Sequence, residues 1–273
     1  MAAPRAHHAA VELDDGPILV VGGTNAAPEI FDPRTTTWSP AAATASVYTS
    51  AEAVRLDDGR VLVVGSTVGQ DIDSEIYDPA SDSWAVTGQL NEDRFSHSAI
   101  TLSDGRVLVA GGVWGEHPQL EAVESVEVFD PVSETWAVID SLKGMRLQPG
   151  LANLTDGTTV IVGAREVTRF DPVADVLRRA APLPDEWQQP IAVTLDDGRV
   201  LMAGIADGTM TLLWNPANGR WTIADPRQTI PSDATATKHA TGRVLVAGGY
   251  RGGDTAHRLT KFFDPAHHSW RPG

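Results

Sequence analysis

Arginine and aromatic residues recur at one fixed distance before a repeated Asp-Gly pair. Arg5, Arg94 and Arg146 each stand eleven residues before the glycine of such a pair, and Tyr48 and Trp187 occupy the same place in two other copies. Guanidinium groups bind carboxylates and sulfates through paired hydrogen bonds, and tyrosine, tryptophan and arginine dominate binding hot spots. This set therefore predicts a shared rim that holds an anionic ligand or an acidic segment of a partner protein.

Further candidates lie near the same rim. Two histidines stand eight residues before a turn glycine, and the loops that follow the glycine-ended apolar runs carry aromatic, acidic and basic residues. The further candidates are His8, His97, Trp114, Glu116, His117, Arg165, Tyr250 and Arg251. Loops of unequal length would make an asymmetric mouth, which a one-sided ligand needs.

Composition excludes several classes of function. The chain has 21 lysine and arginine residues against 36 aspartate and glutamate residues, a net charge of −15, so it would repel a nucleic-acid backbone. It has no cysteine, so thiolate nucleophiles, cysteine-ligated zinc and iron–sulfur clusters are excluded. No apolar run has the length of a membrane span or a signal peptide. We expect a soluble cytoplasmic protein without a nucleic-acid or membrane partner.

A repeat organises the whole sequence. Six copies of a turn glycine followed by an apolar run are separated by 41 to 52 residues, which is the spacing of propeller blades. The turn glycines are Gly16, Gly59, Gly105, Gly157, Gly198 and Gly242. Each copy continues with an aromatic-Asp/Asn-Pro tripeptide and then, in five copies, with a tryptophan, which Leu177 replaces in the fourth.

These repeated motifs together predict four strands in each copy. Asp-Gly between apolar runs favours a type I′ hairpin, in which both central residues have positive φ. The continuously apolar run Val61–Val64 is typical of a strand buried on both faces. The aromatic-Asp-Pro tripeptide ends a third strand, and the tryptophan begins a fourth and supplies packing between neighbouring sheets.

The combined pattern resembles the kelch repeat over essentially the whole chain. The resemblance implies an all-β, six-bladed β-propeller with four antiparallel strands in each blade, a single domain of residues 1–273. The expected blades are 1–42, 43–88, 89–141, 142–183, 184–225 and 226–273. The first and last copies each have four strands of their own, so we expect no strand exchange between them. The fourth copy, which lacks the tryptophan, should be the least regular.

The resemblance leaves two functions open. Within the family, domains that bind acidic peptides and sialic-acid mutarotases show a similar arrangement of arginines around a central channel. Copper chemistry of the galactose-oxidase type needs a cysteine, and the Glu-x-x-x-Asp-x-x-x-His pattern of iron-dependent specifier proteins is absent. We therefore expect no metal and no cofactor. The leading hypothesis is a binding module for a partner protein or a small anionic ligand, and the alternative is a metal-independent isomerase or lyase that uses the same pocket.

Overall fold

The computed structural model contains strands and turns and describes most of the chain. The described residues are 1, 5–23, 27–67, 74–115, 119–142, 147–184, 186–206, 211–225, 230–250 and 260–273. They form six four-stranded antiparallel sheets, which we call blades 1 to 6 and which confirm the predicted fold class. The chain divides into two compact units, Met1–Lys143 and Gly144–Gly273, with three blades each.

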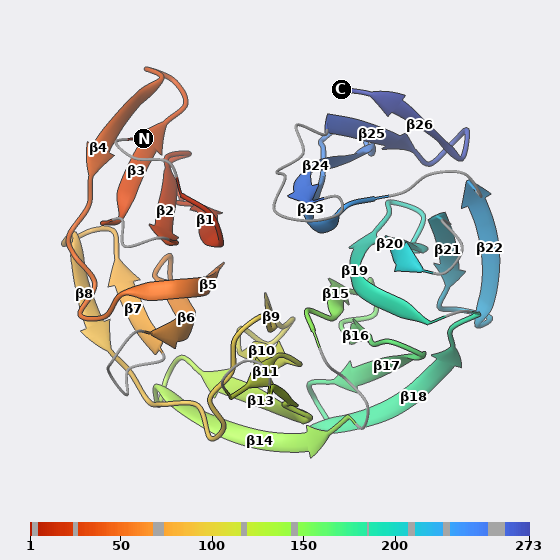
Figure 1. Ribbon diagram of the computed structural model, residues 1–273, viewed down its shortest axis with the longest axis horizontal. Helices are drawn as coiled ribbons and strands as arrows, with labels where there is room; N and C mark the ends of the chain where they lie inside the picture. Colours follow the sequence, from red (N-terminus) through yellow and green to blue (C-terminus); the bar gives the residue numbers. More distant parts are fainter. Residues whose placement is uncertain are drawn as a thin grey trace. The chain divides into compact units, whose positions relative to one another are not determined.

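In the first unit, blades 1 to 3 follow one another along the chain (Figure 1). Blade 1 consists of β1 (His8–Glu12), β2 (Ile18–Gly22), β3 (Glu29–Asp32) and β4 (Thr37–Pro40). Blade 2 consists of β5 (Tyr48–Arg55), β6 (Val61–Thr67), β7 (Ser74–Asp78) and β8 (Ser83–Val86). Blade 3 consists of β9 (Ser98–Thr101), β10 (Val107–Ala110), β13 (Ser125–Asp130) and β14 (Thr135–Ser141). Blade 3 also carries a separate two-stranded hairpin, β11 (Val113–Trp114) and β12 (Glu121–Ala122).

The second unit repeats the plan. Blade 4 consists of β15 (Gly150–Asn153), β16 (Thr159–Val162), β17 (Glu166–Asp171) and β18 (Val176–Pro182). Blade 5 consists of β19 (Trp187–Thr194), β20 (Val200–Ala206), β21 (Thr211–Asn215) and β22 (Arg220–Asp225). Blade 6 consists of β23 (Ser232–Lys238), β24 (Val244–Tyr250), β25 (Thr260–Asp264) and β26 (Ser269–Pro272). Among the described residues every blade takes its four strands from one stretch of chain, interrupted only by the β11–β12 hairpin in blade 3, as expected in the absence of strand exchange.

The second strand of each blade lies in the packed interior. Val61, Val107 and Val200, which begin this strand in blades 2, 3 and 5, are all fully buried. Each of them packs in a cluster with apolar residues of the preceding blade. This burial on both faces confirms the prediction from the continuous apolar runs.

The hairpin turns differ from the prediction in their type. In blade 1 the N–H of Gly16 donates to the Leu13 carbonyl at 3.0 Å, and Gly16, with φ 92°, is the turn residue with positive φ, whereas Asp15 is not among the positive-φ residues. This is the pattern of a type I turn followed by a left-handed glycine, which forms a hairpin with a one-residue bulge. The type I′ prediction was therefore wrong, because the loop contains one more residue than that turn allows.

The tryptophans of the fourth strands tie each blade to the preceding blade of its unit. The indole N–H of Trp136 donates to the Ser74 hydroxyl at 3.2 Å, and that of Trp270 donates to the Thr211 hydroxyl at 2.9 Å. Each tryptophan also packs on the third-strand aromatic residue of its own blade, as Trp136 does on Phe129 with ring centres 5.1 Å apart. The predicted packing between blades is thus confirmed.

Gly112 is required by both its backbone conformation and its surroundings. Its φ is 99°, and a Cβ there would lie 2.9 Å from the Phe95 carbonyl oxygen and 3.2 Å from the Cβ atoms of Arg94 and His97. We expect Gly112→Ala to lower the free energy of unfolding by about 1 to 3 kcal/mol. Gly219→Ala is the matched control, since Gly219 has φ 69° but nothing within 4 Å, and it should lose only about 1 kcal/mol. Equal losses in urea unfolding would show that the close approach has no energetic effect.

Candidate functional site

Arg94 binds a glutamate of its own blade. Its side chain is 0% exposed, and its Nη2 lies 2.6 Å from Glu127 Oε1 and 2.6 Å from the Ser125 hydroxyl oxygen. Its Nη1 donates to the carbonyl oxygens of Ser125 at 2.9 Å and Gly111 at 3.1 Å. Gly111 belongs to the glycine pair that ends the second strand, so the guanidinium joins three parts of blade 3.

Arg5 makes the same kind of contact in blade 1. Its side chain is 1% exposed, and its Nη2 lies 2.6 Å from Glu29 Oε2 and 2.9 Å from the Ala27 carbonyl oxygen. In both blades the anion that the guanidinium binds is a glutamate of the same chain. A ligand could meet Arg5 or Arg94 only if these donors left their glutamates, so a binding role for the two arginines remains a prediction.

Tyr48 and Trp187 belong to the core. Each is 1% exposed: Tyr48 packs with Val21, Val61 and other apolar residues of blades 1 and 2, and Trp187 packs with apolar residues of blades 4 and 5, including Val167. The structure therefore places these two predicted aromatic anchors in the packed interior, where their burial stabilises the fold.

Three buried glutamates, which are not among the predicted site residues, are the hydrogen-bond acceptors of this region. Glu29, Glu75 and Glu127 stand two residues before the third-strand aromatic residue in blades 1, 2 and 3. In blade 2, where Tyr48 occupies the arginine position, the Glu75 carboxylate accepts the backbone N–H groups of Ala45 at 2.8 Å and Ser46 at 3.3 Å. The fixed spacing was the signal that could have revealed them.

The remaining candidates are spread over several environments. His97 is buried, and burial together with Arg94 lowers its pKa to about 3. His8 is exposed as a residue, yet partial burial of its ring and the neighbouring Arg5 lower its pKa. Arg165 is 78% exposed and forms an ion pair with Glu186. Tyr250 ends β24, and its side chain is outside the described part, as are the residues Glu116, His117, Arg146 and Arg251.

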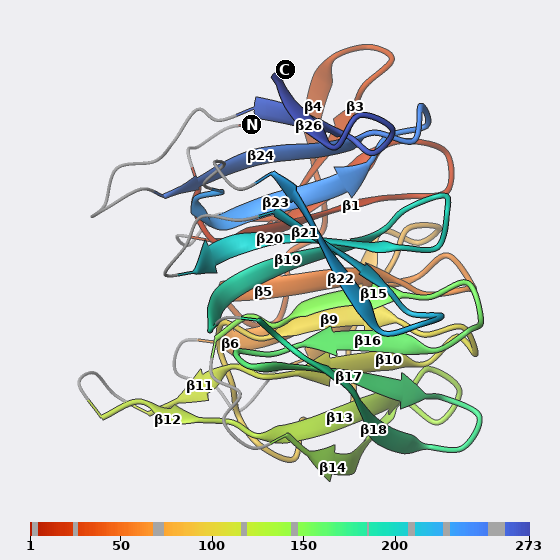
Figure 2. The ribbon, with the colours of Figure 1, turned by 90° about the vertical axis from the view of Figure 1, so that its right-hand side faces the viewer.

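Trp114 is a predicted aromatic anchor that the structure places at the surface. It lies on the β11–β12 hairpin, which extends beyond the four-stranded sheet of blade 3 (Figure 2). The base of the hairpin is fixed, because Val113 and Phe95 exchange backbone hydrogen bonds of 3.0 Å and Val123 N–H donates to the Gly112 carbonyl at 3.0 Å. Trp114 is 49% exposed and Leu120 is 41% exposed.

Glu52 has a shifted pKa that sequence could not indicate. It lies on β5 opposite Val64, and burial raises the pKa of its carboxyl to about 7. Because the folded pKa is raised, the stability that the neutral carboxyl contributes is complete below pH 4.5 and is lost as the pH rises through 7. We expect Glu52→Gln to match the wild-type melting temperature near pH 4.5 and to exceed it at pH 8. The exposed Glu121→Gln should change neither value, and a Glu52→Gln variant that is not more stable at pH 8 would contradict the shift.

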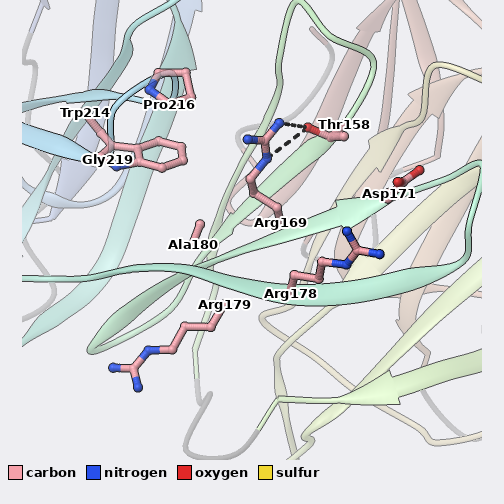
Figure 3. A pocket seen from close by; sticks show the side chains of 9 residues that line it. All are labelled: Thr158, Arg169, Asp171, Arg178, Arg179, Ala180, Trp214, Pro216 and Gly219. Atoms are coloured by element: carbon pink, nitrogen blue, oxygen red, sulfur yellow. Dashed lines mark hydrogen bonds between the residues drawn. The ribbon is translucent and has the colours of Figure 1, made fainter.

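A groove on blades 4 and 5 gathers arginines from two neighbouring strands (Figure 3). It has a volume of about 460 Å³. Its lining residues are Thr158, Arg169, Asp171, Arg178, Arg179, Ala180, Trp214, Pro216 and Gly219. These arginines are not among the predicted site residues, because the repeat is defined by the residues that the six copies share, whereas these arginines belong to one copy.

The described part of the chain shows neither a metal-binding cluster nor a membrane-spanning helix. It contains no group of three or more histidine, aspartate or glutamate side chains placed to hold a metal ion. It also contains no helix of the length and apolar character that crossing a membrane requires.

Comparison with known proteins supports the fold. A family model described as a kelch motif matches residues 94–143, which begin at Arg94 and include the rest of blade 3. No curated protein matches the chain. Among solved structures, one titled "Structure of YjhT" has a TM-score of 0.75 and 15% sequence identity, and the match covers 99% of this chain and 98% of that one. A fungal alcohol oxidase of the AA5 family, in complex with copper, has a TM-score of 0.76 and 18% identity over 98% of this chain and 64% of the oxidase.

The six four-stranded blades and these matches define the fold as a six-bladed β-propeller. The family-model match places a kelch motif in blade 3, and the glycine pairs and aromatic-Asp-Pro turns of the other copies resemble that motif.

Proposed function

We propose that this chain is a binding module that engages a partner protein through the β11–β12 hairpin of blade 3. The observation that carries the proposal is Trp114, a large aromatic residue that is 49% exposed on a hairpin with a fixed base. Tryptophan supplies much contact area at low entropic cost, and it is enriched among the residues that contribute most to binding. Leu120 adds a second exposed apolar side chain on the same hairpin.

The charges near the hairpin indicate which kind of partner it would bind. Glu92, Asp93 and Glu121 are exposed, whereas Arg94 is buried against Glu127. The surface at this hairpin is therefore acidic, which favours a partner with cationic groups around an apolar pocket. The anionic ligand or acidic segment predicted for the channel mouth would need cations other than Arg5 and Arg94, because these two already bind Glu29 and Glu127.

The enzyme alternative requires an acid–base group that titrates near neutral pH. Glu52 is a described residue of that kind, because its pKa is raised to about 7. If a metal-independent isomerase or lyase used Glu52 as its acid–base group, Glu52→Gln would abolish turnover of an acidic substrate.

The partner-binding proposal is tested by comparing two exposed tryptophans. Wild-type chain, Trp114→Ala and Trp38→Ala are immobilised and exposed to a lysate, and proteins retained by the wild type are quantified for each variant. Trp38, which is 39% exposed on β4, is the matched control. We expect a retained protein that is lost with Trp114→Ala and kept with Trp38→Ala, and its purified form should bind Trp114→Ala at least tenfold more weakly. Equal retention by the two variants would refute the role of the hairpin.

A further inference from the structure

The arginines of the groove on blades 4 and 5 are specific to blade 4. The residue just before the third-strand aromatic residue is Arg169 in blade 4 and apolar in every other blade. Its counterparts are Ile30, Ile76, Val128, Leu213 and Phe262. The residue opposite Arg169 on the fourth strand is Arg178, and only Arg271 of blade 6 is also charged at that place.

Two cations directly opposite each other on neighbouring strands destabilise a sheet. Arg169 and Arg178 are such a pair on β17 and β18, and like charges at this spacing repel. The blade relieves part of the repulsion, because Arg169 turns toward the hairpin, where it pairs with Asp156 and donates to the Thr158 hydroxyl at 2.8 Å (Figure 3). Arg178 is exposed. Unlike Arg169 and Arg179, it forms no ion pair with any described residue.

The remaining charges of the groove are already engaged. Arg179 forms an ion pair with Glu166 at 2.9 Å. The Asp171 carboxylate also lines the groove, and its Oδ1 accepts the backbone N–H groups of Val173 at 3.0 Å and Ala174 at 3.2 Å. The uncompensated cation is therefore Arg178, while Asp171 and Asp156 would repel a ligand of higher negative charge.

One end of the groove is mostly apolar. Pro216 of blade 5 and Ala180 of β18 lie at one end of the groove, and the Arg178 guanidinium lies at the other end, turned toward Asp171 (Figure 3). Trp214 also lines the apolar end, but it is only 1% exposed, so Pro216 and Ala180 offer most of the apolar surface that a ligand can reach. A guanidinium at one end of such a groove can hold a carboxylate through two hydrogen bonds while the body of the ligand extends toward the apolar end.

We propose that this groove binds a single carboxylate attached to an apolar body, with Arg178 as the cation that receives it. The carboxylate can belong to a free organic acid or to an acidic side chain flanked by apolar residues in a partner segment. The site lies in the second unit, and it does not depend on the β11–β12 hairpin or on the partner proposed for it.

The test uses probes that differ in charge and in carrier. Calorimetry at about 50 mM salt, where screening is modest, measures binding of butyrate, of a blocked pentapeptide with one glutamate between two leucines, of its glutamine counterpart and of inorganic phosphate. Each probe is titrated into wild type, Arg178→Gln and Arg271→Gln. Arg271 is exposed and occupies the equivalent place in blade 6, so it controls for loss of a surface charge.

We expect butyrate, the glutamate peptide or both to bind the wild type, with at least tenfold weaker binding to Arg178→Gln and unchanged binding to Arg271→Gln. The glutamine peptide should also bind at least tenfold more weakly than the glutamate peptide. Binding of butyrate assigns the site to free acids, and binding of the peptide alone assigns it to a partner segment. The proposal is overturned if neither carboxylate binds at millimolar concentration, if phosphate binds more tightly, or if Arg178→Gln has no effect.

Discussion

Arg94→Ala is expected to lower the free energy of unfolding by about 3 to 5 kcal/mol, because it leaves a buried carboxylate without its cation. The Glu127 side chain is 0% exposed, and Arg94 Nη2 approaches its Oε1 at 2.6 Å. The variant also removes the donors to the Ser125 and Gly111 carbonyl oxygens. Urea-induced unfolding followed by circular dichroism measures the loss.

Two further variants test whether the loss of stability comes from breaking the buried ion pair or from removing any arginine. Arg165→Ala removes an arginine whose side chain is 78% exposed, and it should change stability by less than about 0.5 kcal/mol. A double variant, Arg94→Leu with Glu127→Leu, should lose less than Arg94→Ala alone, since no unpaired charge stays buried. A loss below about 1 kcal/mol for Arg94→Ala would mean that water or the N–H donors of Asn91 and Glu92, which already bind the Glu127 carboxylate, are enough to stabilise its charge.

Much of the fold could be predicted from the sequence because each repeated motif determines only local structure. A turn glycine, an apolar run and an aromatic-Asp-Pro tripeptide each determine the structure of a few neighbouring residues, and six copies confirm one another. The turn type was missed even so, because Asp-Gly alone does not show how many residues the loop contains. The hydrogen bond from the Gly16 N–H to the Leu13 carbonyl shows that the loop is one residue longer than a type I′ turn allows.

The anion that Arg94 binds could not be predicted from the sequence. The position of Arg94 relative to its turn was recognised, but its anion, Glu127, lies 33 residues further along the chain. Residue type and spacing are the same for an arginine whose guanidinium is available to a ligand and for one that already binds a carboxylate of its own chain. Only the burial of both side chains makes that distinction.

The groove of blades 4 and 5 was missed for a different reason. Repeats are recognised by what their copies share, whereas a binding site on one blade depends on what a single copy changes. The comparison of Arg169 with the apolar residues at its place in the other blades needs only the sequence. That Arg178 faces the same groove as Trp214 of the next blade requires the structure.

Acid is expected to destabilise the protein through His97. Its ring is buried in the folded chain, where the pKa is about 3, and it returns to an ordinary value near 6.5 on unfolding. Between these two values the unfolded chain binds a proton that the folded chain does not bind. Stability attributable to His97 is therefore complete above pH 6.5 and falls as the pH drops toward 3, by up to about 1.4 kcal/mol per pH unit.

His97→Gln isolates this contribution because glutamine is polar but does not titrate. The variant should be less stable than the wild type at pH 7, since a fully packed side chain has been replaced. Its free energy of unfolding should then decline less steeply than that of the wild type from pH 6.5 to 4, so the two curves converge. Above pH 7 neither state of His97 carries a proton, and the curves should run parallel, which provides the internal control. Curves that stay parallel down to pH 4 would show that the folded chain admits the proton, and that water or a rearranged Arg94 reaches the ring.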